Sequence, residues 1–169
     1  MPEWEARDAA VQLEKRAGVI EGVLAKLKPE EWVRLGAPEA YIDQLTQTRK
    51  FTAYLGAQAQ NLQREPGKLS VVLDTFLRLD HLQLLLDSII VGARRYQNAA
   101  LADLLGTTII QNSTTRELLM EYTRQLAGER EKEWEVANAE AQRCRVSLSK
   151  KPPAAVAAPG KKAAAPGRP

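Results

Sequence analysis

The sequence has only one cysteine and one histidine among its 169 residues. A single cysteine, Cys144, excludes an intramolecular disulfide and leaves a structural zinc site of the usual Cys/His kind unsupported. The lone histidine, His81, also excludes the two Glu-x-x-His pairs that hold a di-iron centre in some helical bundles. We therefore expect neither a metal nor another cofactor.

Aromatic residues and long apolar runs are scarce as well. Aromatic residues make up 5% of the chain, and its 44% hydrophobic content is mostly Leu, Ala, Val and Ile, which suits helix packing better than a β-sandwich. The longest nearly uncharged apolar stretch, Leu82–Val91, is far shorter than a transmembrane span. The first residues lack the pattern of a signal peptide. This favours the cytoplasm if Met1 is the native start, and an exported protein if an upstream leader was removed.

The net charge of +3 is unevenly distributed along the chain. Residues 150–169 contain no acidic residue and hold five basic ones: Lys150, Lys151, Lys161, Lys162 and Arg168. Removing those five from the 24 basic residues leaves 19 against all 21 acidic ones, so residues 1–149 carry about −2. The composition predicts a helical domain over 1–149 and a disordered Ala/Pro/Lys-rich tail over 150–169.

Apolar residues recur at steps of three and four along most of residues 1–149, which is the spacing of amphipathic helices. We predict helices over Glu3–Leu27, Pro29–Trp32, Pro38–Arg64, Lys68–Val91, Asn98–Gln111 and Thr114–Ser149. Asn98 is the predicted N-cap of the fifth of these, and Asn112-Ser113 is predicted to break the chain before the last.

The short connections between these segments predict an antiparallel arrangement. The predicted fold is therefore all-α: an antiparallel bundle of about five helices, with a long C-terminal helix and a disordered tail. The segment Lys68–Val91 has the broadest apolar surface, so we expect it at the centre of the bundle.

His81 is the one candidate for acid–base catalysis. It follows Asp80, and Asp74 and Arg78 lie at helical spacing from it, so a carboxylate could orient a general base. No motif places a serine or cysteine nucleophile beside it. We therefore interpret His81 as a boundary residue of an apolar helix and predict that the chain is not an enzyme.

Arg94-Arg95-Tyr96-Gln97, followed by Asn98, offers two guanidinium groups beside an aromatic ring at a connection between helices. Arg94, Arg95 and Asn98 at a helix N-terminus would suit an anion, whereas solvated linker charges are the ordinary interpretation. A small-ligand site between the third and fourth long helices, near His81 or these arginines, is one alternative function.

The last predicted helix has surplus apolar residues near its end. They recur at steps of three and four: Trp134, Ala137, Ala141, Cys144 and Leu148. We expect this stripe to meet the start of the first helix, Trp4 to Leu13, within one chain or to mediate a homodimer.

The leading hypothesis from the sequence is therefore a non-enzymatic helical interaction or scaffold protein, whose partner is a protein. Weak binding of nucleic acid or an anionic surface through the basic tail is the other alternative. Five positive charges would give only weak, salt-sensitive binding, which disfavours nucleic acid.

Overall fold

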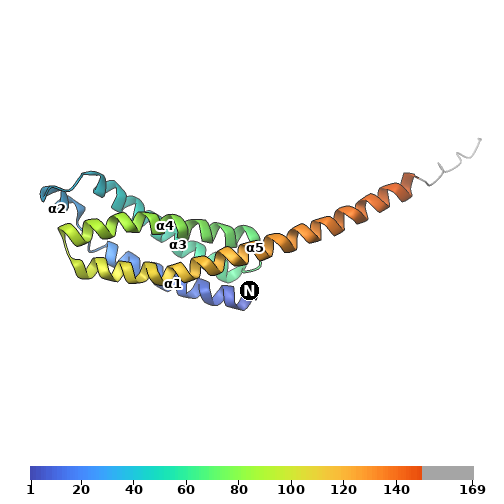
Figure 1. Cartoon of the computed structure of the whole chain (residues 1–169), viewed down its shortest axis with the longest axis horizontal. Coiled ribbons are helices and arrows are strands. Elements are labelled where there is room, and N and C mark those ends of the chain that lie inside the picture. The colour runs from blue at the N-terminus through green and yellow to red at the C-terminus, as the bar shows by residue number, and fades with distance from the viewer. Residues whose placement is uncertain (150–169) are drawn as a thin grey trace, which may run out of the picture. The chain divides into compact units, whose positions relative to one another are not determined.

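The computed structural model describes residues 1–149 and contains, within that range, five α-helices and no strand (Figure 1). The helices are α1 (Glu3–Leu24), α2 (Pro29–Arg34), α3 (Ala40–Arg64), α4 (Leu69–Tyr96) and α5 (Ala99–Ser149). The predicted all-α fold with a long C-terminal helix is confirmed. The predicted tail, residues 150–169, lies outside the described residues.

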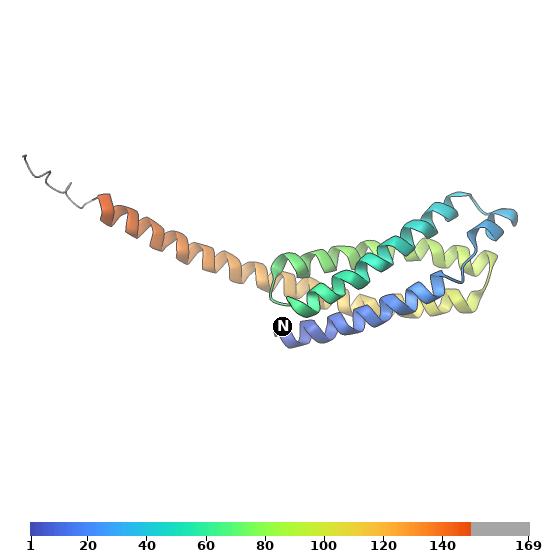
Figure 2. The same ribbon diagram turned by 180° about the vertical axis from the view of Figure 1, so that it is seen from behind.

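The chain divides into a compact unit, Met1–Arg130, and a second unit that begins at Glu131. Within the compact unit, α1, α3, α4 and the first part of α5 run in alternating directions around one core (Figures 1 and 2). The first part of α5 is joined to α1 through Arg16 and to α4 through an ion pair between Arg116 and Asp80. The second unit is described below by itself.

The apolar stripes predicted in the first and second long helices form the core of this unit. In α1 the stripe residues are buried, and small ones among them allow close helix contact: a Cβ added at Gly56 of α3 would lie 3.8 Å from the Cβ of Ala17. Two threonines, Thr48 and Thr52, are also buried in α3. Each hydroxyl donates to the carbonyl oxygen four residues earlier, at 2.7 and 2.8 Å, so no polar group is left unsatisfied there.

The predicted end of the third long helix at Val91 is wrong, because α4 continues to Tyr96. Gly92 and Ala93 are both buried, and a Cβ at Gly92 would lie 2.7 Å from Cε1 of Tyr41 and 2.8 Å from Cζ3 of Trp32. Glycine is therefore present for close packing against two aromatic rings, and it does not end the helix.

The predicted break at Asn112-Ser113 is also wrong, because α5 is continuous from Ala99 to Ser149. Asn112 and Thr115 are buried against the bundle, where Arg16 of α1 reaches both side chains. The polar residues that indicated a helix end are instead polar groups in a helix–helix contact.

The central position expected for the third long helix is wrong as well. One face of α4 is buried, and the opposite face exposes Leu77, Leu84 and Val91 to 53, 66 and 60%. In a bundle of four helices around one core, each helix keeps a solvent-facing side. The breadth of the apolar surface on α4 therefore reflects an exposed apolar stripe, not burial on all sides.

Candidate interaction surface on the distal part of α5

His81 lies at an exposed position of α4. Its imidazole packs against the ring of Phe51, with the ring centroids 4.4 Å apart. The nearby carboxylates are engaged by arginines: Asp74 pairs with Arg78, and Asp80 pairs with Arg116, each at 2.9 Å. The orienting carboxylate that a general base would need is thus used elsewhere. Within residues 1–149, no cluster of three or more His, Cys, Asp or Glu side chains is placed to hold a metal ion.

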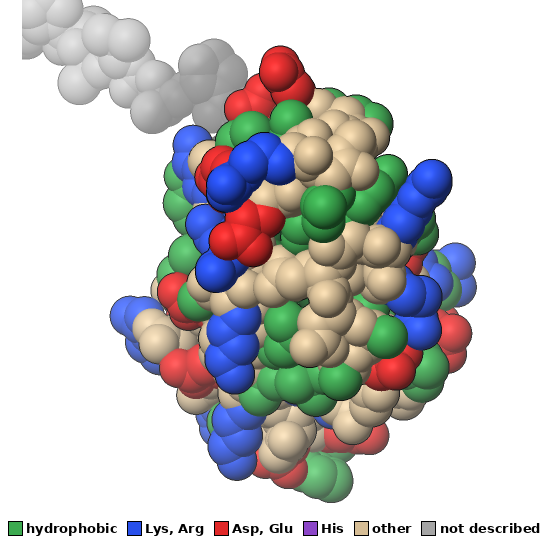
Figure 3. All heavy atoms as spheres, turned by 90° about the vertical axis from the view of Figure 1, so that its left-hand side faces the viewer, with side chains coloured by type: hydrophobic (Ala, Val, Ile, Leu, Met, Phe, Trp, Pro, Cys, Tyr) green, Lys and Arg blue, Asp and Glu red, His purple; other side chains and the backbone are tan. Residues whose placement is uncertain are grey.

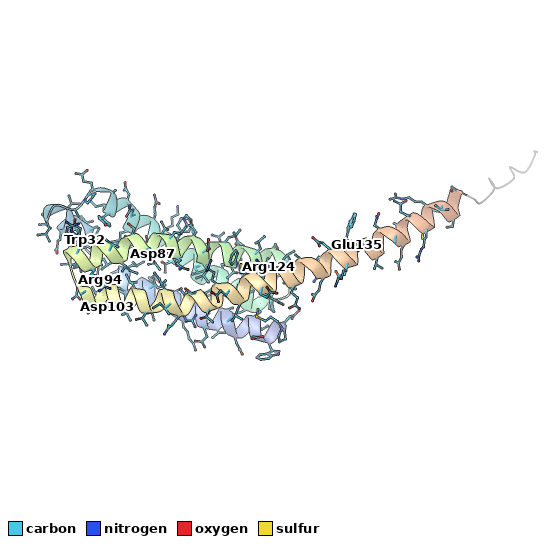
Figure 4. All side chains as sticks on the ribbon, viewed as in Figure 1. Trp32, Asp87, Arg94, Asp103, Arg124 and Glu135 are labelled. Atoms are coloured by element: carbon cyan, nitrogen blue, oxygen red, sulfur yellow. The ribbon has the colours of Figure 1, made fainter. Side chains whose placement is uncertain are left out.

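Arg94 and Arg95 lie at the end of α4 and Asn98 lies in the turn before α5, and each has a partner. Arg94 Nη2 lies 2.6 Å from Asp103 Oδ1, and both residues are labelled in Figure 4. The guanidinium of Arg95 lies over the ring of Tyr96, 5.3 Å from its centroid.

Asn98 Oδ1 accepts hydrogen bonds from the backbone N–H groups of Ala100 and Leu101 at 2.8 and 3.3 Å. The predicted N-cap is therefore confirmed, and it occupies the first-turn amides that an anion would have used. Figure 3, which views this end of the bundle, shows acidic and basic side chains interspersed on the surface.

No helix within residues 1–149 combines the length and the apolar character needed to cross a lipid bilayer.

The clearest exposed apolar surface lies on the distal part of α5, residues 131–149. We call the residues Trp134, Ala137, Ala141, Cys144 and Leu148 the distal stripe. Trp134 is 67% exposed and Leu148 is 71% exposed. At 100° per residue, the spacing places the whole stripe within an arc of about 80° on one helix face. Side chains of this segment, Glu135 among them, stand out from the ribbon on all sides in Figure 4.

The other half of the predicted interaction surface is only partly available. Trp4 at the start of α1 is 64% exposed, whereas Leu13 is completely buried in the bundle. Leu13 therefore belongs to the core and cannot contribute to a docking surface. The spacing that suggested an interaction stripe in α1 is the spacing that buries this helix inside its own unit.

A second apolar surface was missed from the sequence. Leu77, Leu84 and Val91 lie seven residues apart on the outer face of α4, and we call them the α4 stripe. Asp80 and Asp87 lie along the same side of the helix. The available signal was the breadth of apolar residues in this helix, which we interpreted as burial.

Comparisons of this chain with protein-family models, with curated proteins and with solved structures found no match.

Proposed function

We propose that this chain is a non-enzymatic helical interaction protein, in which the distal part of α5 docks on a helix of a protein partner. The observation that supports the proposal is the exposure of Trp134 and Leu148 at the two ends of one apolar helix face. Burying a large apolar side chain contributes about 1.5–3 kcal/mol. A contiguous stripe on a soluble helix is a typical site for such burial.

The physics of isolated helices supports the same proposal. Residues 131–149 are, apart from Ala141, exposed, so the segment gains almost nothing from tertiary packing. Isolated helices of this length are marginally stable in water. A partner helix bound to the distal stripe would remove the apolar face of the segment from water. The same contact would stabilise the helical conformation of the segment.

The test is site-specific photo-crosslinking in cells that naturally make the protein. A photoreactive amino acid replaces Ala141 on the distal stripe or, as a matched control, Ala139 on the opposite face of the same helix. We expect a covalent adduct with a protein from position 141 and little from position 139. Equal yields at both positions, or none at either, would overturn the proposal.

The same experiment separates this function from binding through the basic tail. Deleting residues 150–169 should leave the adduct at position 141 unchanged. Loss of the adduct on deletion would show that the interaction depends on the tail, and it would contradict a role for the distal stripe.

A further inference from the structure

We infer that the partner of the distal stripe is the distal stripe of a second copy, aligned parallel and in register. This inference rests on the proposed function and goes one step further by naming the partner and its orientation. The charged residues beside the stripe indicate this partner and this orientation.

The distal stripe has the three-four spacing of a heptad repeat. Trp134, Ala141 and Leu148 take the a positions, and Ala137 and Cys144 take the d positions. The residues that flank such a seam are those just before each a position and just after each d position. Here they are Glu133, Glu140 and Ser147 on one side, and Asn138 and Arg145 on the other.

In a parallel pair, a flanking residue before an a position meets the flanking residue five positions further along the other helix. Glu140 of each copy then lies opposite Arg145 of the other, so the pair forms twice. Neither Glu140 nor Arg145 has an ion-pair or hydrogen-bond partner among residues 1–149. Both charges are therefore available for a second copy.

An antiparallel pair lacks this complementarity. The flanking positions that precede the a residues then face each other, so Glu140 of one copy lies beside Glu140 or Ser147 of the other when the stripes overlap fully, and it meets no arginine. The charge pattern thus favours the parallel orientation.

Docking of the distal stripe on the α4 stripe of another copy is disfavoured for a related reason. Asp87 lies along the α4 stripe and Glu140 flanks the distal stripe, so an acidic residue would lie beside each of the two surfaces. Such a contact would also be heterologous, so it would build rings or open chains of molecules.

In the parallel alignment, each residue of the seam packs against the same residue of the other copy. Cys144 meets Cys144, and the small residues Ala137 and Ala141 let the two backbones approach closely. The seam covers only about two heptads, so we expect a weak dimer whose population depends on protein concentration. Val136 and Val146 lie off the stripe and stay exposed.

The experiment is disulfide trapping with the full-length chain and an added thiol oxidant. Two thiols lose two protons and two electrons to the oxidant and form one S–S bond between the copies. We expect rapid trapping through the native Cys144. A control, Ala139→Cys combined with Cys144→Ser, moves the single thiol to the opposite face and should be trapped many-fold more slowly. Equal trapping rates would overturn the inference.

Charge reversal tests the orientation independently. Glu140→Lys and Arg145→Glu should each weaken the dimer several-fold, measured by sedimentation equilibrium, because each places like charges opposite one another twice. The double variant should restore the native affinity. Failure of the double variant to restore it would overturn the parallel register, since a change in helix stability alone would not be reversed.

The two proposals fail in different ways. If purified protein is monomeric at all concentrations and Cys144 is not preferentially trapped, the second-copy inference is overturned. If position 141 still forms an adduct with another protein in cells, the proposed function stands. Absence of both signals overturns both.

Discussion

The guanidinium of Arg16 on α1 donates a hydrogen bond to the hydroxyl oxygen of Thr115 on α5 at 2.8 Å. The same Nη1 atom lies 3.1 Å from the carbonyl oxygen of Gln111 and 3.4 Å from Oδ1 of Asn112. One cation thus satisfies a group of polar atoms at a buried helix contact. This contact explains how α5 passes through a polar stretch without a break.

Replacing Arg16 should therefore weaken the compact unit. Arg16→Met keeps much of the side-chain volume but leaves the oxygens of Asn112 and Thr115 without this donor. We expect the free energy of unfolding to fall by about 1.5–3 kcal/mol, measured by urea denaturation. Lys15→Met, at an exposed neighbouring position, should change it by less than about 0.5 kcal/mol. Equal losses in the two variants would contradict this role of Arg16.

Two glycines should respond in opposite directions to the same substitution. Gly92→Ala places a methyl group against Tyr41 and Trp32, so we expect a loss of about 1–3 kcal/mol of stability. At Gly106 in α5, a Cβ would meet no atom within 4 Å. Gly106→Ala should stabilise the protein by about 0.5–1 kcal/mol, because alanine favours the helix. Thermal unfolding of the two variants measures both signs, and a stable Gly92→Ala variant would contradict the packing described.

Gln97 should hold the α1–α2 connection to the end of α4. Its Oε1 accepts from Nε1 of the buried Trp32 at 2.9 Å and from the backbone N–H of Lys28 at 3.0 Å, and its Nε2 donates to the carbonyl oxygen of Lys26 at 2.8 Å. Gln97→Leu removes all three bonds and leaves the indole N–H unpaired.

We expect Gln97→Leu to lose about 1–3 kcal/mol and to shift the tryptophan fluorescence of the folded state. Gln97→Glu retains the acceptor for Trp32 and loses only the donor to Lys26, so its loss should be smaller. Identical losses for the two variants would show that the indole bond contributes nothing.

Tyr122 should make the compact unit sensitive to alkaline pH. Burial raises the pKa of this phenol above its ordinary value of 10.0, and the carboxylates of Glu3 and Glu129 raise it further. A raised folded-state pKa gives a stability contribution that is complete below the unfolded pKa and is lost as pH rises through the folded pKa. Tyr122→Phe should therefore reduce the loss of stability above about pH 10. Urea denaturation at a series of pH values across that range measures this loss. An equal alkaline loss of stability in the native chain and in Tyr122→Phe would contradict this role of the buried phenol.

The predictions that rested on periodicity were the reliable ones. The stripes of α1 and α3, the N-cap at Asn98 and the presence of a long C-terminal helix follow from residue spacing and local hydrogen bonding, which a sequence displays directly. The errors came from tertiary contacts. Asn112 is a residue type that is common at helix ends. Here its side chain contacts Arg16 of α1, and this tertiary contact stabilises it inside a continuous helix.

The interaction surface was likewise predicted only in part, because its burial depends on tertiary contacts. Residue spacing identifies an apolar stripe but does not say whether the stripe is buried in its own fold. Leu13 and Leu148 both lie on apolar stripes with three-four spacing, yet Leu13 is fully buried and Leu148 is 71% exposed. The α4 stripe was missed because a broad apolar helix can be central or can expose one apolar side.

The most direct test of the distal stripe as an interaction surface uses the native thiol of Cys144, which is exposed in the single chain. Its rate of alkylation is measured in intact cells and divided by the rate for dilute purified protein. The same ratio is obtained for Ala139→Cys combined with Cys144→Ser. We predict that Cys144 is protected several-fold in cells, whereas the thiol at position 139 reacts equally fast in both settings. Equal ratios at the two positions would contradict the proposal that the distal stripe is covered by a partner.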